Sequence, residues 1–334
     1  MTKTLMEFDF IDKYLKPLAY DKAVSFNLSD DVALLPVVQN SQFVTSKDIF
    51  VENVHFLKSD NPRDIASRLL LSNISDMAAA GSTAKYYMLG LPKRDDLIEN
   101  GFYDEFCAGL ASIQEEYSIS LIGGDTVTVN NDLFFSLTIF GEVKSDKLLR
   151  RNAAKIDDLI FVTGNIGDSF LGLQYKLDKA RFSSLNHAEI THILEAHNRP
   201  KIPHLFAHKL AENNLSKCAI DISDGLIADL NHICKESKTG AKINIGDIIL
   251  SKAARKLIDN GNYTIEELIT GGEDYQLLFT SNMANKNDIF TLANRFKISL
   301  NYIGKVTAFL ENDNIQILNI DGKNIKLNSF GYEH

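Results

Sequence analysis

Acidic side chains stand between apolar residues or glycines in six short blocks of the 334-residue sequence. The blocks are LSDDVALL, VTSKDIFV, LLLSNISDMAAAG, LIGGDTV, AIDISDGL and TGGEDYQLLF. Their acids are Asp30, Asp31, Asp48, Asp76, Asp125, Asp221, Asp224, Glu273 and Asp274. A buried carboxylate without a partner costs several kcal/mol or shifts its pKa. A fold that places these blocks at the edge of a core must therefore supply partners for the acids.

Two kinds of partner fit these acids. Each acid alone could cap a helix or pair with an arginine or lysine, and Asp224 could cap a helix that begins at Gly225. The blocks contain a single basic residue, Lys47. If several acids converge in the fold, divalent cations are the natural counter-charge, and oxygen-rich sites suit Mg²⁺.

Two blocks also contain paired glycines beside an apolar segment. Gly123 and Gly124 follow one such segment, and Gly271 and Gly272 precede another. Paired glycines let backbone N–H groups approach a phosphate closely, although most such pairs are simple turns. Neither pair belongs to a Walker loop or to a GxGxxG motif.

Length and composition favour a soluble, cytoplasmic protein of two domains. A chain of 334 residues exceeds one ordinary core. The net charge of −9 argues against nucleic acid or an anionic membrane as a partner. Cys107, Cys218 and Cys234 lack the spacing of a disulfide framework or zinc site, which predicts buried, reduced thiols. The N-terminus does not resemble a signal peptide, and no stretch is apolar enough to span a membrane.

The residue pattern predicts mixed α and β structure in two halves. The polar segment KSDKLLRRN predicts a boundary that divides the chain into domains 1–148 and 149–334. Strands are expected at residues 43–50, 120–122, 134–143, 158–162, 219–222 and 275–279, with short β segments over the last 40 residues. Helices are expected at residues 62–80 and 104–117, from residue 168, within 178–198, and over 223–238.

In order and spacing, the blocks resemble the thiamine-monophosphate kinases of the aminoimidazole-ribonucleotide-synthetase superfamily. The matching segments are LSDDVALL, VTSKDIFVENVHF, NISDMAAAG, LIGGDT, RRNAAKIDDLIFVTGNIGDS, NRPKIP, AIDISDGLIADLNHI, GGEDYQLLF and FGYEH. They run from about residue 28 to the end of the chain. No single segment is decisive, but their joint occurrence is highly specific.

The resemblance implies an α+β fold of two domains. The N-terminal sheet domain would bind ATP and Mg²⁺ and dimerise through its strands, and the C-terminal α/β sandwich domain would close the active site. It also implies a homodimeric enzyme that phosphorylates thiamine monophosphate with ATP to give thiamine diphosphate.

The resemblance assigns a role to individual residues. Those implied to bind several magnesium ions are Asp30, Ser46, Asp48, Asp76, Asp125, Asp221 and Asp224. Those implied to contact ATP are Gly124, Asp125, Arg151 and Ser223. Those implied to contact thiamine monophosphate are His55, Glu273 and Tyr332.

The implied reaction is direct, in-line phosphoryl transfer without a phosphoenzyme. A phosphate oxygen of thiamine monophosphate is already anionic at neutral pH, so no strong general base is needed and no residue is assigned as one. Metals held by carboxylates would bring two charged phosphates together and stabilise the transferred group.

Two other functions compete with this interpretation. One is another ATP-using enzyme of the superfamily, such as a purine-biosynthetic synthetase, a selenophosphate synthetase or a hydrogenase-maturation protein. A selenophosphate synthetase would need a reactive cysteine near the N-terminus, but the first cysteine is Cys107, and the VENVHF and GGEDYQLLF segments favour the kinase over the purine enzymes. The other is a non-catalytic nucleotide-binding dimer, against which the six aspartates of metal type argue.

The sequence departs from the family pattern at two places. Lys47 stands where the family usually has Thr, and NAAKIDD replaces the usual SGAKPGD. In a regular strand, Ser46 and Asp48 share one face and Lys47 points away from them. If the strand ended near Ser46, the Lys47 ammonium could instead reach the triphosphate. The first orientation is favoured because Ile49 and Val51 continue the strand pattern.

Overall fold

The computed structural model describes residues 6–309, 314–327 and 329–332. The chain forms two compact units. The first contains Met1–Met77 and Thr83–Ser145, and the second contains Ala78–Ser82 and Asp146–His334. The contacts thus divide the chain at Ser145, close to the boundary that the polar segment predicts, and they add a short earlier segment to the second unit.

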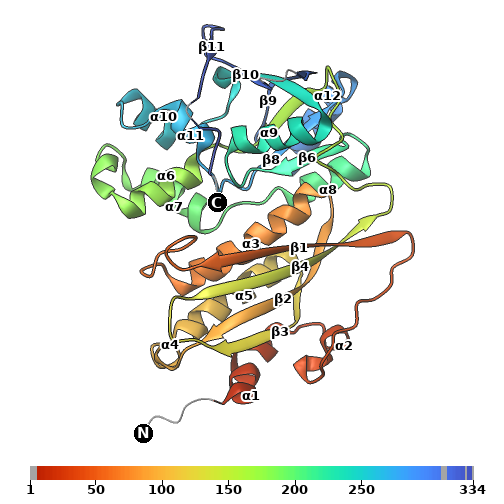
Figure 1. Cartoon of the computed structure of the whole chain (residues 1–334), viewed down its shortest axis with the longest axis vertical. Helices are drawn as coiled ribbons and strands as arrows, with labels where there is room; N and C mark the ends of the chain where they lie inside the picture. Colours follow the sequence, from red (N-terminus) through yellow and green to blue (C-terminus); the bar gives the residue numbers. More distant parts are fainter. Residues whose placement is uncertain (1–5, 310–313, 328, 333–334) are drawn as a thin grey trace. The chain divides into compact units, whose positions relative to one another are not determined.

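The first unit is built on a four-stranded sheet with the strand order β1-β4-β2-β3 (Figure 1). Its strands are β1 (Ser41–Val51), β2 (Thr83–Lys93), β3 (Ser120–Thr128) and β4 (Phe134–Lys144). β4 pairs antiparallel with both β1 and β2, whereas β2 and β3 are parallel. A parallel pair needs a crossover, and α4 (Asp95–Glu99) with α5 (Phe102–Tyr117) provides it.

Helices α3 (Pro62–Ala79) and α5 cover one face of this sheet (Figure 1). The Asn61 side chain accepts a hydrogen bond from the Arg63 N–H at 2.9 Å, which caps α3. Between the layers, the rings of Phe106 and Phe135 stack with centroids 4.6 Å apart. Before β1 the chain forms short helical turns, among them α1 (Glu7–Phe10) and α2 (Lys22–Ser25).

The opposite face of the sheet, here called the outer face, carries one exposed apolar side chain from each strand. They are Ile49, Met88, Val127 and Phe134, with exposed fractions between 39% and 50%. Within the single chain, β4 is buried on one face only. Its residues alternate between the helix-covered face and the outer face, because helices cover one side only.

The second unit is built on a seven-stranded sheet with the order β11-β10-β7-β9-β5-β8-β6. Its strands are β5 (Leu159–Thr163), β6 (Cys218–Asp221), β7 (Thr239–Asn244), β8 (Leu277–Ser281), β9 (Leu300–Ala308), β10 (Ile315–Leu318) and β11 (Asn324–Ile325). β10 and β7 are parallel and the other neighbours are antiparallel.

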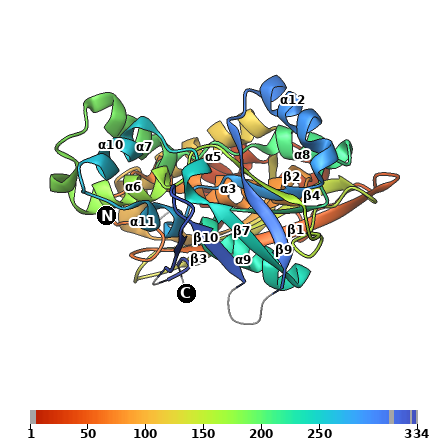
Figure 2. The same ribbon diagram turned by 90° about the horizontal axis from the view of Figure 1, so that it is seen from above.

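Helices cover both faces of this second sheet, which makes it a sandwich as expected. The helices are α6 (Asp168–Leu177), α7 (His187–Asn198), α8 (His204–Glu212), α9 (Leu226–Ser237), α10 (Lys252–Asp259), α11 (Ile265–Thr270) and α12 (Lys286–Phe296). On one face, α9 buries Leu230 and Ile233 against Ile160 and its neighbours. On the other face, aromatic rings of β5 and β8 contact rings of α8 and α12. Figure 2 shows α9 and α12 on opposite sides of the strands.

Several expected elements are present with shifted ends. Within the segment 178–198, a 3₁₀ turn (Lys179–Phe182) precedes α7, and β3 extends six residues beyond the predicted end at 122. Cys218 and Cys234 are buried, Cys107 is partly exposed, and all three thiols are free. Burial raises the pKa of Cys107 to about 12 and that of Cys218 to about 11. No helix within the described ranges has the length and hydropathy required to cross a membrane.

Candidate functional site

In the first unit, β1 and α3 bring three of the predicted metal ligands together. Ser46 and Asp48 lie two residues apart on the strand face that meets α3. The Ser46 hydroxyl donates to Asp76 Oδ2 at 2.5 Å, and the Ser72 hydroxyl donates to Asp48 Oδ2 at 2.8 Å. Ser72 and Asp76 are four residues, or about one helical turn, apart on α3. Their side chains therefore lie on the helix face that meets Ser46 and Asp48, which share one face of β1. We call Ser46, Asp48, Ser72 and Asp76 the β1/α3 cluster.

The carboxylate of Asp48 is held in a partly desolvated position. Burial raises its pKa above the ordinary value, and the hydrogen bond from Ser72 opposes that rise only in part. The other donor and acceptor atoms of the cluster are also oxygens. Such a set of hard oxygen ligands fits Mg²⁺ better than a soft transition metal.

Lys47 points away from the β1/α3 cluster. Its ammonium donates to Ser136 Oγ and, at 3.4 Å, to Thr138 Oγ1. Both acceptors lie on β4, opposite Lys47 on the outer face. β1 runs without a break through Val51, so the favoured orientation of Lys47 is confirmed.

His55 is fixed in the loop that follows β1. The Val51 N–H donates to His55 Nδ1 at 3.1 Å, so the other ring nitrogen carries the proton in the neutral imidazole. The ring stacks on Phe50 with centroids 5.3 Å apart, and the Arg68 guanidinium donates to the His55 carbonyl. A protonated Nε2 on a packed ring can donate a hydrogen bond to an anion.

Two further predicted ligands lie apart from the β1/α3 cluster within one chain. Asp125 is exposed on β3, which is three strand spacings from β1, or about 14 Å. Its partner on β2 is Gly90, which pairs with Ser136 of the outer face, so Asp125 also lies on that face. Asp30 is exposed in the segment before β1, where it accepts the Asp31 N–H at 2.8 Å.

In the second unit, a turn after β6 carries Asp221, Ser223 and Asp224. Asp221 ends the strand and is 3% exposed. The helix was predicted to begin at Ser223, but α9 begins at Leu226 because Gly225 adopts φ 123°. The alternative that Asp224 caps this helix is wrong, since Gly225 occupies the cap and no side chain bonds there.

Asp229 lies in the first helical turn of α9 and holds the preceding Ser223–Asp224 turn in place. Its Oδ2 accepts the N–H groups of Ser223 at 3.0 Å and Asp224 at 3.1 Å. Burial and the neighbouring Asp224 raise the pKa of Asp229 to about 7. One ligand atom each of Asp224, Asp229 and His232 lies within 4.8 Å of the others.

The GGEDY segment is joined to the same turn by backbone hydrogen bonds. The Glu273 N–H donates to the Ser223 carbonyl and the Tyr275 N–H to the Ile222 carbonyl, each at 2.8 Å. A Cβ on Gly272 would lie 2.4 Å from the Ser223 carbonyl oxygen, so only glycine permits this approach. Glu273 and Tyr275 both adopt positive φ, at 67° and 50°.

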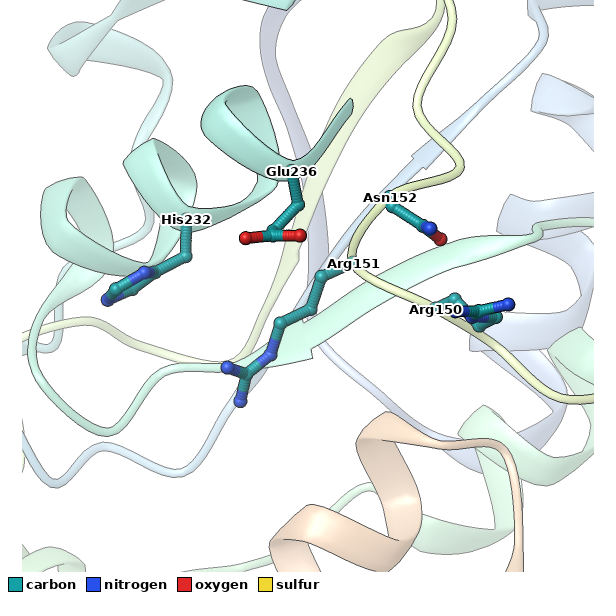
Figure 3. A pocket seen from close by; sticks show the side chains of 5 residues that line it. All are labelled: Arg150, Arg151, Asn152, His232 and Glu236. Atoms are coloured by element: carbon teal, nitrogen blue, oxygen red, sulfur yellow. The ribbon is translucent and has the colours of Figure 1, made fainter. Parts of the chain in front are cut away.

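Tyr332 lies beside the Ser223–Asp224 turn, and Arg151 lies beside α9. The Tyr332 N–H donates to the Asp224 carbonyl at 3.0 Å, which places the C-terminal segment against the turn. Arg151 lines a pocket of about 380 Å³ together with His232 and Glu236 of α9 (Figure 3). Arg150 and Asn152 complete the lining, and Arg150 leaves the chain in a different direction from Arg151 (Figure 3).

Ser72 and Asp229 form hydrogen bonds with predicted site residues, and His232 lies near Asp224, but none of the three was identified from the sequence. Ser72 precedes Asp76 by four residues in a predicted helix, and that spacing places both on one face. Asp229 stands between Ala228 and Leu230, the same apolar context that marked the other acids. His232 follows Asp229 by three residues, so it too could have been found from the helical period.

Gly124, which lies within β3, offers a stability test of the paired glycines. A Cβ at this position would lie 2.0 Å from the Leu89 carbonyl oxygen, and φ is 153°. The adjacent Gly123 would meet only the flexible Met88 side chain, at 3.3 Å. We expect Gly124→Ala to lower the free energy of unfolding by at least about 1–3 kcal/mol and Gly123→Ala to change it much less. Urea denaturation measures the free energy of unfolding of both variants. Equal decreases would contradict the claim that pairing of β2 with β3 requires glycine at position 124.

Comparisons with known proteins assign the family. Models of the N-terminal and C-terminal domains of AIR synthase related proteins match residues 29–143 and 155–309. The thiamine-monophosphate kinase of Buchnera aphidicola subsp. Schizaphis graminum (strain Sg) is 36% identical over 310 residues, which cover 90% of this chain and 91% of that protein.

Two solved structures share the fold over nearly the whole chain. The crystal structure of thiamine-monophosphate kinase from Stenotrophomonas maltophilia K279a has a TM-score of 0.80 and 28% identity, covering 96% of this chain and 98% of that chain. AaThiL complexed with AMPPCP and TMP has a TM-score of 0.75 and 26% identity, covering 98% of this chain and 97% of that chain. On its sequence and on the domains that it contains, the chain belongs to the thiamine-monophosphate kinase family.

Proposed function

We propose that the chain transfers the γ-phosphoryl group of ATP directly and in line to a phosphate oxygen of thiamine monophosphate, at magnesium ions held by its clustered oxygen side chains. As a member of its family, the chain is an ATP-dependent kinase that forms thiamine diphosphate. The observation that carries the magnesium proposal is the β1/α3 cluster, in which Ser46, Asp48 and Asp76 converge.

The proposed metal ligands are hard oxygen donors in both units. Ser46, Asp48 and Asp76 supply them in the first unit, and Asp221 and Asp224 supply them in the second. Asp30 and Asp125 stay proposed ligands by family resemblance alone. When bound, Mg²⁺ would neutralise phosphate charge and stabilise the transferred group.

The chain's own residues position the two phosphates. Arg151 can bind a phosphate of ATP through a planar pair of N–H donors, and Gly124 and Ser223 are proposed to contact ATP as well. For the acceptor, His55, Glu273 and Tyr332 are proposed contacts. Because Glu273 and Tyr332 are bonded to the Ser223–Asp224 turn, nucleotide and acceptor contacts share one backbone framework.

We also propose that the enzyme is a homodimer in which the outer faces of two copies pair. Each of the four strands leaves an apolar side chain exposed there, namely Ile49, Met88, Val127 and Phe134. Exposed apolar side chains on all four strands of a sheet suit an interaction surface, and a second copy would present the same face in return. We propose that the kinase acts in the cytoplasm, where ATP is available and the three free thiols would be stable.

The metal assignment predicts that Asp48→Asn and Asp76→Asn lower turnover by at least about 100-fold. Burial disfavours the charged form of Asp48, so Asp48→Asn should leave the metal-free melting temperature unchanged or higher. The adjacent Lys47→Thr is the matched control, and its rate and Mg²⁺ dependence should barely change. Steady-state kinetics across Mg²⁺ concentrations measure all three. Near-normal activity of both aspartate variants in excess Mg²⁺ would overturn the assignment.

Direct transfer predicts that unphosphorylated thiamine is not phosphorylated at a measurable rate. With ATP made chiral at its γ-phosphorus, one in-line transfer should invert the configuration of that phosphorus in the product. Retention would indicate two transfers and a phosphoenzyme. Conversion of thiamine as fast as its monophosphate would instead reveal a hydroxyl kinase with a general base.

The dimer proposal predicts that Met88→Glu, on the outer face, yields monomers at micromolar concentration. Burying an unpaired carboxylate in an apolar interface is unfavourable by several kcal/mol. Met283→Glu is the control, since Met283 is 50% exposed in the second unit and should not affect assembly. Light scattering distinguishes the outcomes, and a monomeric, fully active parent protein would refute the proposal.

A further inference from the structure

The buried carboxylate of Asp229 on α9 bonds to Ser223 and Asp224, the proposed ATP and Mg²⁺ contacts, but is itself assigned to neither ligand. Asp229 is 2% exposed, and its Oδ2 accepts two successive N–H groups, those of Ser223 and Asp224. Both hydrogen bonds have ordinary lengths, and both donors belong to a turn that is outside the helix. The turn would otherwise leave these N–H groups without acceptors in this part of the chain.

We propose that Asp229 is a positioning residue, which fixes the Ser223–Asp224 turn in the conformation that binds Mg²⁺ and ATP. The inference rests on the proposed roles of Ser223 and Asp224. Asp229 acts through the backbone, so its contribution is the hydrogen-bond acceptor and not the donation of an electron pair to a metal ion.

The geometry of the turn explains why such an anchor is needed. Gly225 adopts φ 123°, so the chain leaves Asp224 in a conformation that few residues adopt and that local sequence does not enforce. On the other side of the turn, the Ser223 and Asp224 carbonyls are already used by the Glu273 and Tyr332 N–H groups. The carbonyls of the turn are thus held by two other segments, and its N–H groups are held by Asp229.

A side-chain carbonyl-type oxygen has two lone pairs, so the Asp229 Oδ2 can accept both successive N–H groups and anchor the turn. The Asp229 N–H also donates to the Gly225 carbonyl at 3.0 Å, within the helix. The anchor is therefore rigidly attached to α9, whose apolar face is buried against the sheet. This path connects the core of the second unit to the turn.

Four variants test the proposal, with Asp158 as the matched control. Asp158 is also a buried aspartate whose Oδ2 accepts a turn N–H, that of Lys155 at 3.0 Å. It precedes β5, beside the end of β8 opposite to the one that pairs with Asp221. The variants are Asp229→Asn, Asp229→Leu, Asp158→Leu and, as a test of the proposed metal role itself, Asp224→Asn.

The measurement is the dissociation constant of a non-hydrolysable ATP analogue with Mg²⁺, by calorimetry, together with the melting temperature. Asp229→Leu removes the acceptor and should raise the dissociation constant at least about tenfold. Asp229→Asn keeps an acceptor oxygen and should raise it less than about threefold. Asp158→Leu should lower the melting temperature without changing the dissociation constant.

The outcomes separate three explanations. Weakened binding in Asp229→Asn as severe as in Asp224→Asn would show that the charge of Asp229 is required, as for a direct metal ligand, and would overturn the positioning role. Unchanged binding in Asp229→Leu would also overturn it. If Asp229→Leu does not fold, near-normal binding by Asp229→Asn supports the proposal and weak binding refutes it. Unchanged Mg²⁺-dependent binding in Asp224→Asn would instead refute the proposed function of the turn.

Discussion

The desolvation of carboxylates is the constraint that acts on both groups of acids, the β1/α3 cluster and the turn before α9. Asp48 and Asp76 accept hydrogen bonds from serine hydroxyls, and Asp229 accepts them from backbone N–H groups. Neutral donors satisfy oxygen lone pairs but do not cancel the negative charge. The raised pKa of Asp48 shows that its charge is unfavourable in this position, and a bound cation would compensate that charge and stabilise the folded chain.

Backbone hydrogen bonds hold the strained backbone of the GGEDY segment. Glu273 and Tyr275 adopt positive φ, which is costly for residues with a Cβ. Their N–H groups bond to the carbonyls of Ser223 and Ile222, and Gly272 allows the two segments to approach. The left-handed conformations thus persist because a neighbouring turn defines them. Displacing either segment would release the other.

The sequence predicted those features that depend on local periodicity. The strand period places Ser46 and Asp48 on one face with Lys47 on the other. β2 was missed because Gly90 and Pro92 interrupt its apolar pattern, although Pro92 lies beyond the β4 pairing and needs no ladder hydrogen bond on that side. The start of α9 was misplaced because the long-range bonds of the turn override helix propensity. Strand order also depends on long-range contacts, so the distance of Asp125 from β1 could not be predicted.

The position of Asp125 connects metal binding with assembly. In one chain this acid is exposed on the outer face, where water solvates its charge and no cation is required. A second copy over that face would exclude water from Asp125, as α3 does from Asp48, and the charge would then need compensation. Cation binding at Asp125 and the pairing of two outer faces would therefore favour one another, because each lowers the free-energy cost of the other. Both the apolar side chains and Asp125 on the outer face would then contribute to formation of the homodimer.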